Sequence, residues 1–283
     1  MILDAHTHIF PEEVIRRRED FFADEPALRL LYESPKAKMV GPEELLTAME
    51  EEGVEAAVLL GFPWRRESHW RRHNEVILEA QQRWPRKFFG FCAAHPARPG
   101  GLREIERCLA AGARGIGEVA FYLRDHSDDI MDLLAPVAEL CLHYRVPLLL
   151  HATDRVGAEY PGRSLTPLGA VYQVLKVFPE TTWILAHWGG RLPFYGLLKK
   201  EAPEVLKNVY FDTAASPYVY RPVIYRVVAE MVGPEKVLFG SDYPLLTPSR
   251  YIKEMQDTGL PEDWQELILG KNLARLMNWD LLG

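Results

Sequence analysis

The chain has 283 residues, of which 48% are hydrophobic and 26% are charged, and its formal net charge is −7. This composition is typical of a soluble globular protein, and the negative charge argues against a general nucleic-acid binder, which needs a cationic face. No apolar run approaches the length of a membrane span, and three widely spaced cysteines suit a reducing compartment. We therefore expect a cytoplasmic protein that acts on a small molecule, and the composition leaves a homodimer open.

Short apolar runs alternate with amphipathic stretches along the chain. The runs are rich in Val, Ile, Leu and Phe, and several are apolar at every position, which is typical of strands buried on both faces. They predict strands at residues 2–6, 56–60, 88–93, 114–119, 147–151, 183–187, 208–212 and 236–240. The stretches between them predict helices at residues 42–53, 74–85, 101–113, 129–145, 166–179 and 220–233, with one or two more at 263–279.

Eight strands that alternate with helices predict a (β/α)8 TIM barrel, in a single domain over residues 1–283. The alternative is a doubly wound open sheet. Against it, no G-x-G-x-x-G motif follows the first strand, and no P-loop motif occurs. Residues 11–41 form the longest insertion and contain two prolines, so we expect a loop with one or two short helices near the barrel mouth.

Residue types that bind metals stand at the C-terminal ends of five predicted strands, where barrel enzymes place their active sites. Residues two apart on a strand share a face, so His6 and His8 can point at one ion. By the same rule, residues 116, 149 and 185 should fill the barrel below residues 118, 151 and 187. A single histidine at a strand end is usually only a hydrogen-bonded polar group. Six such residues together predict a metal site: His6, His8, Glu118, His151, His187 and Asp242.

Imidazole and carboxylate ligands without a thiolate suit Zn²⁺ best, with Mn²⁺ or Fe²⁺ as alternatives. A metal with an open position lowers the pKa of its bound water and supplies a hydroxide nucleophile. Asp242 would touch both the metal and this water, and could carry the proton from the nucleophile to the leaving group.

The loops after the strands supply candidate substrate-binding residues. In the loop at 61–74, Arg65 or Arg66 could grip a substrate carboxylate beside Trp64, or could simply begin a solvated basic helix. Asp212 ends the seventh predicted strand and is a candidate for orienting a ligand. The remaining substrate-binding candidates are His95 after the third strand, Tyr122 and Arg124 after the fourth, and Trp188 after His187.

Four motifs resemble the amidohydrolase superfamily, in the amidohydrolase-related branch that includes carboxymuconate-semialdehyde and resorcylate-type decarboxylases. The motifs are DAHTH (4–8), LLLHA (148–152), ILAHWGG (184–190) and LFGSDYP (238–244), and they span nearly the whole chain in the family's order. The resemblance implies a distorted (β/α)8 barrel with a metal held by His6, His8, His151 and Asp242. It also implies a catalytic role for His187, as a ligand of a second metal or as a hydrogen-bond partner of metal-bound water.

Glu118 leaves the number of metal ions and the reaction open. Many two-metal members of the superfamily have a carboxylated lysine on the fourth strand, and some hydrolases have a bridging glutamate there. The decarboxylase-like members typically lack a bridging acid and use one metal. Glu118 could instead pair with Arg114 or Arg124, or bind the substrate. We therefore expect one or two divalent ions, with Glu118 among their ligands.

Three functions are compatible with these residues. Glu118 favours a metal-dependent hydrolase of a small amide, lactone or ester, which is our first hypothesis. The GSDYP motif and the arginine-rich loop favour the alternative, a metal-dependent, non-oxidative decarboxylase of an aromatic or unsaturated carboxylic acid. The third is a metal-binding scaffold without activity, in which Asp242 would have no use.

Overall fold

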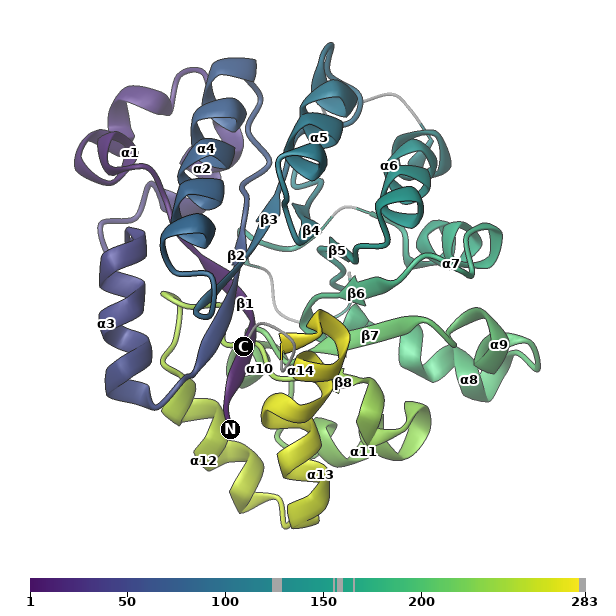
Figure 1. Ribbon diagram of the computed structural model, residues 1–283. Coiled ribbons are helices and arrows are strands. Elements are labelled where there is room, and N and C mark those ends of the chain that lie inside the picture. The colour runs from purple at the N-terminus through teal and green to yellow at the C-terminus, as the bar shows by residue number, and fades with distance from the viewer. Residues whose placement is uncertain (124–128, 155, 157–159, 165, 280–283) are drawn as a thin grey trace.

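The computed structural model describes residues 1–123, 129–154, 156, 160–164 and 166–279 (Figure 1). Within these residues, eight parallel strands pair in chain order, each with the next along the chain. A doubly wound sheet would reverse its strand order, so the predicted (β/α)8 TIM barrel is confirmed. The strands are β1 (Leu3–His8), β2 (Ala56–Leu60), β3 (Phe88–Cys92), β4 (Gly115–Val119), β5 (Leu148–Leu150), β6 (Trp183–Leu185), β7 (Val209–Asp212) and β8 (Val237–Leu238).

The barrel closes between β1 and the chain that follows β8. The backbone N–H of Asp242 donates to the carbonyl of His6 (2.9 Å), and Thr7 forms a parallel bridge with Tyr243. This closure places the last metal-ligand candidate directly beside the first.

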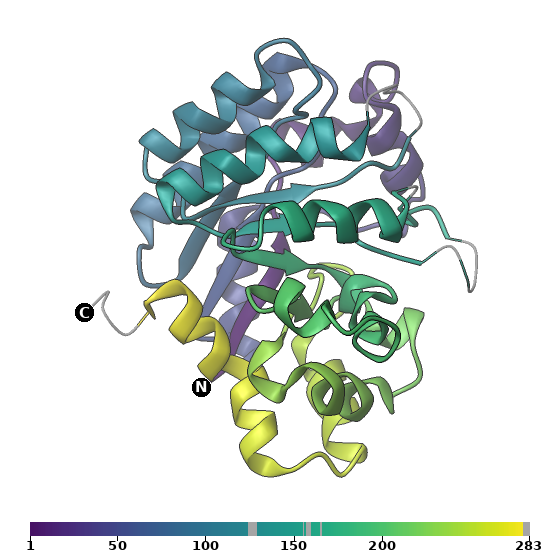
Figure 2. The same ribbon diagram turned by 90° about the vertical axis from the view of Figure 1, so that its right-hand side faces the viewer.

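Helices surround the barrel (Figure 1, Figure 2). One apolar cluster packs between strands and helices, and a second fills the barrel, where α14 covers one end with Leu273 and Met277. No helix in the described part of the chain is long and apolar enough to cross a membrane. The helices outside the 11–41 insertion are α3 (Pro42–Glu52), α4 (Glu67–Arg83), α5 (Gly101–Ala110), α6 (Ile130–Tyr144), α7 (Leu168–Val177), α8 (Tyr195–Leu198), α9 (Ala202–Val205), α10 (Ser216–Val219), α11 (Ile224–Val232), α12 (Pro248–Asp257), α13 (Glu262–Glu266) and α14 (Asn272–Met277).

Residues 11–41 contain two short helices, α1 (Glu12–Arg17) and α2 (Pro26–Tyr32), joined through a 3₁₀ turn at Arg18–Phe21. Leu31, Tyr32, Ala37 and Lys38 from this segment line the cavity at the barrel mouth. The segment therefore forms part of the wall of the site described below.

Several helices differ from the sequence prediction, among them the short helices α8, α9 and α10, which were not predicted. Helix α4 begins at Glu67, about two turns before the predicted start at residue 74, because the buried Trp70 and His73 extend its buried face toward the N-terminus. Helix α12 was not predicted, although Pro248 stands at its start and the buried Tyr251 and Met255 have helical spacing.

The predicted alternation of side chains holds on β5 and fails on β4 and β6. Leu149 lies in the cluster inside the barrel, whereas Ile116 and Leu185 lie in the cluster beneath the helices. The pairing of β4 with β5 shifts register after Ile116. Beyond β6, the chain turns at His187, which adopts a left-handed conformation (φ 55°). These two irregularities let Glu118 and His187 face the cavity where simple alternation does not place them.

Candidate metal centre and active site

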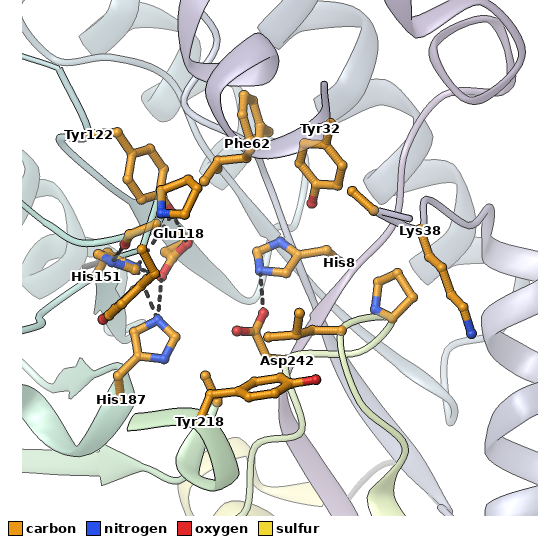
Figure 3. Close-up of a pocket in the computed structure, with 18 of the residues that line it drawn as sticks. His8, Tyr32, Lys38, Phe62, Glu118, Tyr122, His151, His187, Tyr218 and Asp242 are labelled. Atoms are coloured by element: carbon orange, nitrogen blue, oxygen red, sulfur yellow. Dashed lines mark hydrogen bonds and ion pairs between the residues drawn. The ribbon is translucent and has the colours of Figure 1, made fainter. Parts of the chain in front are cut away.

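Six side chains of metal-ligand type converge at the mouth of the barrel. Figure 3 labels all of them except His6. They form three overlapping triads, and within each triad the potential ligand atoms lie within 4.8 Å of one another. The triads are His6, His8 and Glu118; His6, His187 and Asp242; and Glu118, His151 and His187. The structure thus brings together the whole predicted ligand set.

The spacing of these atoms matches the ligands of a shared ion. The Nε2 atoms of His6 and His8 are 3.2 Å apart, and His8 Nε2 lies 3.4 Å from Asp242 Oδ1. His187 Nε2 lies 3.1 Å from His151 Nδ1. Atoms bound at about 2.0–2.2 Å from one ion are separated by roughly 3.0–3.5 Å around it. The cluster therefore has the dimensions of a divalent metal site.

In His6 and His187, a hydrogen bond on the side of the ring away from the cluster determines which ring nitrogen can bind a metal. His6 Nδ1 lies 2.9 Å from Asp212 Oδ2, and His187 Nδ1 lies 3.0 Å from the carbonyl oxygen of Ala214. Both partners accept, so each Nδ1 carries a proton, and in the neutral ring each Nε2 directs its lone pair toward the cluster. This is the arrangement of a histidine that is ready to bind a metal.

His151 presents the other nitrogen. Its Nε2 lies 2.7 Å from the carbonyl oxygen of Gly162, so Nε2 donates and Nδ1 is left with a lone pair. That Nδ1 lies 2.7 Å from Glu118 Oε1. A lone pair and a carboxylate oxygen repel each other at this distance unless a cation lies with them. Either a second proton on the ring or a metal ion satisfies this contact.

The charges of the cluster also favour a bound cation. Burial lowers the pKa of His6, but the charge and hydrogen bond of Asp212, with Asp242 and Glu118, raise it to about 10. Burial raises the pKa of Glu118 and of Asp242, but the neighbouring histidines outweigh burial and hold both values low. Ionised carboxylates thus surround a proton on His6, and a divalent metal can replace that proton. The donors present fit such a metal.

A cavity of about 470 Å³ opens directly from the cluster. This volume lies in the range of small-molecule sites, roughly 300–1,000 Å³. Ligand candidates occupy one end, and aromatic and aliphatic side chains form most of the remaining wall. The residues outside the ligand set are Leu31, Tyr32, Ala37, Lys38, Phe62, Tyr122, Tyr160, Pro161, Gly162, Ala215, Tyr218, Val219, Pro244 and Leu245.

The arginines of the predicted 61–74 loop lie outside this cavity. Both Arg65 and Arg66 are exposed at the start of α4, and neither is among the cavity-lining residues. The Arg66 guanidinium pairs with Asp24. Trp64 is fully buried and donates to His73 Nδ1 (2.9 Å). The structure therefore favours the solvated-helix alternative for the two arginines.

Two further candidates also lie away from the cavity lining. Trp188 is buried in the core beside Tyr225, and its indole N–H donates to Ser216 Oγ (3.0 Å). The left-handed turn at residues 187–188 directs this ring away from the cavity. His95 is buried against Phe121 rather than in the cavity wall.

Tyr122 is the substrate-binding candidate that lines the cavity. Its hydroxyl donates to Glu118 Oε2 (3.2 Å) and lies 3.5 Å from His151 Nδ1. Arg124, the other candidate from this loop, lies outside the described residues. Tyr32 and Tyr218, by contrast, were not selected from the sequence, because an isolated tyrosine in an insertion or a loop carries no spacing signal.

A family model described as Amidohydrolase (Amidohydro_2) matches residues 3–279. Together with the barrel, this match defines the class of protein, an enzyme of the TIM-barrel type, and the donor cluster at the barrel mouth suits a divalent metal. The chain belongs to the Amidohydro_2 family.

Several of the proteins to which this chain is similar are decarboxylases. The 6-methylsalicylic acid decarboxylase of Penicillium expansum is 35% identical over 86 aligned residues, which cover 25% of this chain and 26% of that protein. The 5-carboxyvanillate decarboxylase of Sphingomonas paucimobilis has a TM-score of 0.75 at 18% identity, over 98% of both chains. A dihydroxybenzoic acid decarboxylase from Polaromonas sp. JS666, with bound manganese and 2-nitroresorcinol, has a TM-score of 0.73 at 17% identity, over 99% of this chain and 97% of that one.

A 4-oxalomesaconate hydratase from Rhodopseudomonas palustris also shares the fold, with a TM-score of 0.65 at 21% identity, over 99% of this chain and 96% of that one. At these identities the structural likeness shows the fold, and the reaction must be argued from the site.

The comparisons overturn our first hypothesis, a hydrolase of amides, lactones or esters. The curated relative and the first two solved structures named above are decarboxylases. The hydrolase hypothesis depended on Glu118 as a bridge between two metals. In the structure, Glu118 has partners inside a single cluster, in Tyr122 and His151, so its presence does not require a second ion. The scaffold hypothesis also fails, because the family is one of enzymes.

Proposed function

We propose that this protein is a divalent-metal-dependent, non-oxidative decarboxylase of an aromatic acid with a hydroxyl group next to its carboxylate. The observation that carries the proposal is the donor cluster at one end of a cavity with aromatic walls. The acids named for two similar proteins, 6-methylsalicylic acid and 5-carboxyvanillate, both carry a hydroxyl beside a carboxylate. That pair of oxygens suits chelation at such a cluster.

One metal ion is the simplest occupant. The three triads share His6, Glu118 and His187, so they describe one centre rather than separate ones. Histidine and carboxylate ligands accept Mn²⁺ and Zn²⁺, and manganese is present in the similar Polaromonas enzyme. We therefore expect one Mn²⁺ or Zn²⁺ per chain. Some of the six clustered side chains would bind it directly, and the others would contact these ligands.

A metal ion bound there would attract the oxygens of the acid and withdraw negative charge from them. The side chains of the cavity do the rest. Phe62 and Tyr122 hold the ring and exclude water. Asp242 lies at the cavity, and its carboxylate takes up a proton from water and passes it to the ring carbon that bears the substrate carboxylate. The carbon–carboxylate bond then breaks, its electron pair restores the aromatic ring, and carbon dioxide leaves.

The test is release of carbon dioxide from a panel of 2-hydroxybenzoates by the Mn²⁺-loaded protein. Product formation is followed by ultraviolet absorbance, without oxygen. Asp242→Asn should lower kcat by about 10²-fold or more, because it removes the proton carrier. Asp263→Asn, at an exposed aspartate on α13, is the matched control and should keep full activity. Ester or lactone turnover without carbon dioxide release would refute the proposal.

A further inference from the structure

The hydroxyl of Tyr32 belongs to the cavity wall, and the donor cluster does not use it. In Figure 3 its oxygen points into the cavity, on the side of His8 and Asp242. Among the described residues, no hydrogen bond engages this hydroxyl. Tyr122, on the opposite wall, differs because its hydroxyl already donates to Glu118.

Aromatic packing holds the ring of Tyr32 in place. The ring lies edge-on to Phe10, with centroids 5.1 Å apart, and to Phe62, with centroids 6.1 Å apart. Both phenylalanines are almost completely buried. Since these contacts lie behind the hydroxyl, they fix its direction before any ligand binds.

A second anchor holds the helix that carries Tyr32. Glu25, immediately before α2, has a fully buried carboxylate. It accepts the backbone N–H of Arg65 (2.6 Å) and of Arg66 (2.9 Å), and it contacts His69 Nδ1 (2.6 Å). These bonds tie the insertion to the start of α4. Tyr32 therefore belongs to a rigid part of the wall rather than to a loose flap.

The surroundings keep the Tyr32 hydroxyl protonated. Burial raises its pKa, and the negative charges of Asp242 and Glu118 raise it further. The hydroxyl is thus a hydrogen-bond donor that faces the metal-binding end of the cavity. A partly buried donor without an acceptor is unfavourable, so a ligand oxygen in the cavity would satisfy it.

We propose that Tyr32 donates a hydrogen bond to an oxygen on the edge of the bound aromatic acid that faces the donor cluster. Tyr32 is then a substrate-binding residue contributed by the 11–41 insertion. The donor cluster and Tyr32, which come from distant parts of the chain, then both hold this edge of the acid. This inference rests on the proposed function, which identifies the ligand as a hydroxylated aromatic acid.

Tyr32→Phe tests the inference, because it removes the hydroxyl and keeps the ring that packs on Phe10 and Phe62. The probe is 2-nitroresorcinol, titrated calorimetrically into the Mn²⁺-loaded protein. The dissociation constant should rise about tenfold or more, a loss of ~1.4 kcal/mol, while the metal content and Tm stay unchanged. The matched control is Tyr195→Phe, at a half-buried tyrosine on α8 outside the cavity, which should bind within twofold of wild type.

Three results would overturn the inference. The first is wild-type affinity in a fully metal-loaded Tyr32→Phe protein. The second is loss of metal in this variant with unchanged affinity per loaded site, which would make the role structural. The third is a wild-type protein that does not bind the probe.

Turnover separates this inference from the proposed function. If wild type decarboxylates no hydroxybenzoate but Tyr32→Phe still weakens the probe, the proposed function fails and the role of Tyr32 stands. If wild type decarboxylates and Tyr32→Phe has an unchanged dissociation constant and kcat/KM, only the inference fails.

Discussion

Asp212 organises two of the candidate ligands with a single buried carboxylate. Its Oδ2 accepts from His6 Nδ1 (2.9 Å), and its Oδ1 accepts the backbone N–H groups of His187 (2.9 Å) and Ala214 (3.0 Å). The left-handed backbone of His187 is unfavourable for a residue other than glycine, and the bond from its N–H to Asp212 helps to offset that cost. One side chain thereby sets the tautomer of one ligand and the backbone of another.

Asp212→Asn should weaken metal binding about 10- to 100-fold. The amide can present its NH₂ group to His6, which would then carry its proton on Nε2, where the metal binds. The affinity is measured by competition with a chelator of known strength. Asp263→Asn serves as the control, and wild-type metal affinity in Asp212→Asn would contradict this role.

At the scale of elements, the joint between α2 and α4 determines the shape of the cavity. The Glu25 carboxylate lies at the N-terminal end of α4, where the helix dipole and free N–H groups favour a negative charge. This joint holds the insertion over the barrel mouth. Glu25 and the start of α4 are distant from each other in the sequence, so this joint exists only in the folded chain.

Glu25→Ala should destabilise the protein by about 2–4 kcal/mol, because it leaves two backbone N–H groups without their acceptor. It should also raise KM, since the wall that carries Tyr32 loses its anchor. Urea unfolding and steady-state kinetics measure the two effects. Glu33→Ala, at an exposed glutamate just beyond α2, should change neither. An unchanged KM in Glu25→Ala would show that α2 is held by packing alone.

At the scale of the whole molecule, the site joins the first strand of the barrel to the chain that follows the last strand. The buried Asp4 accepts the backbone N–H groups of His6 and of Ser241 (each 3.0 Å), which links β1 to the chain after β8. The ligand candidates are spread over the sequence from residue 6 to residue 242. A metal bound among them would therefore stabilise the closed barrel as a whole.

Removal of the metal should lower Tm. A ligand present at 100 times its dissociation constant stabilises the folded state by about 2.7 kcal/mol, which corresponds to roughly 5 °C for a protein of this size. Scanning calorimetry of metal-loaded and chelator-treated protein measures the shift. His187→Ala removes a shared member of two triads and should show a much smaller metal-dependent shift. Equal shifts in both proteins would place the metal elsewhere.

The contribution of His73 to stability should fall as the pH drops below about 6.5. Burial lowers the pKa of His73 to about 3, although its bond to the carbonyl of Ile9 acts in the opposite direction. The unfolded chain takes up this proton near its ordinary pKa, whereas the folded protein does not until about pH 3. The stabilisation is thus complete above pH 6.5 and is lost as the pH falls.

This effect of His73 amounts to about 2 kcal/mol between pH 7 and pH 5. Urea unfolding at both pH values measures it. His73→Gln should raise the stability at pH 5 relative to that at pH 7 by this amount, compared with wild type, while His143→Gln, at an exposed histidine on α6, should leave the difference unchanged. An equal pH dependence in wild type and His73→Gln would exclude this cause.

The sequence by itself determined the barrel and the membership of the donor cluster. Apolar runs of strand length and amphipathic stretches are local patterns, and the strand-end position of residues such as His8, His151 and Asp242 follows from them. In a parallel barrel all these ends meet at one rim. Local patterns were therefore sufficient to predict that these side chains lie together.

Only the tertiary structure decided which of the other rim residues face the cavity. Arg65 and Trp188 follow the C-terminal ends of barrel strands in the sequence. The start of α4 and the turn at His187 nevertheless direct their side chains away from the cavity. Tyr32 lies far from any strand end and reaches the cavity because Glu25 and Phe10 hold its helix there. Such placements depend on contacts between segments far apart in the chain, and a local pattern does not contain them.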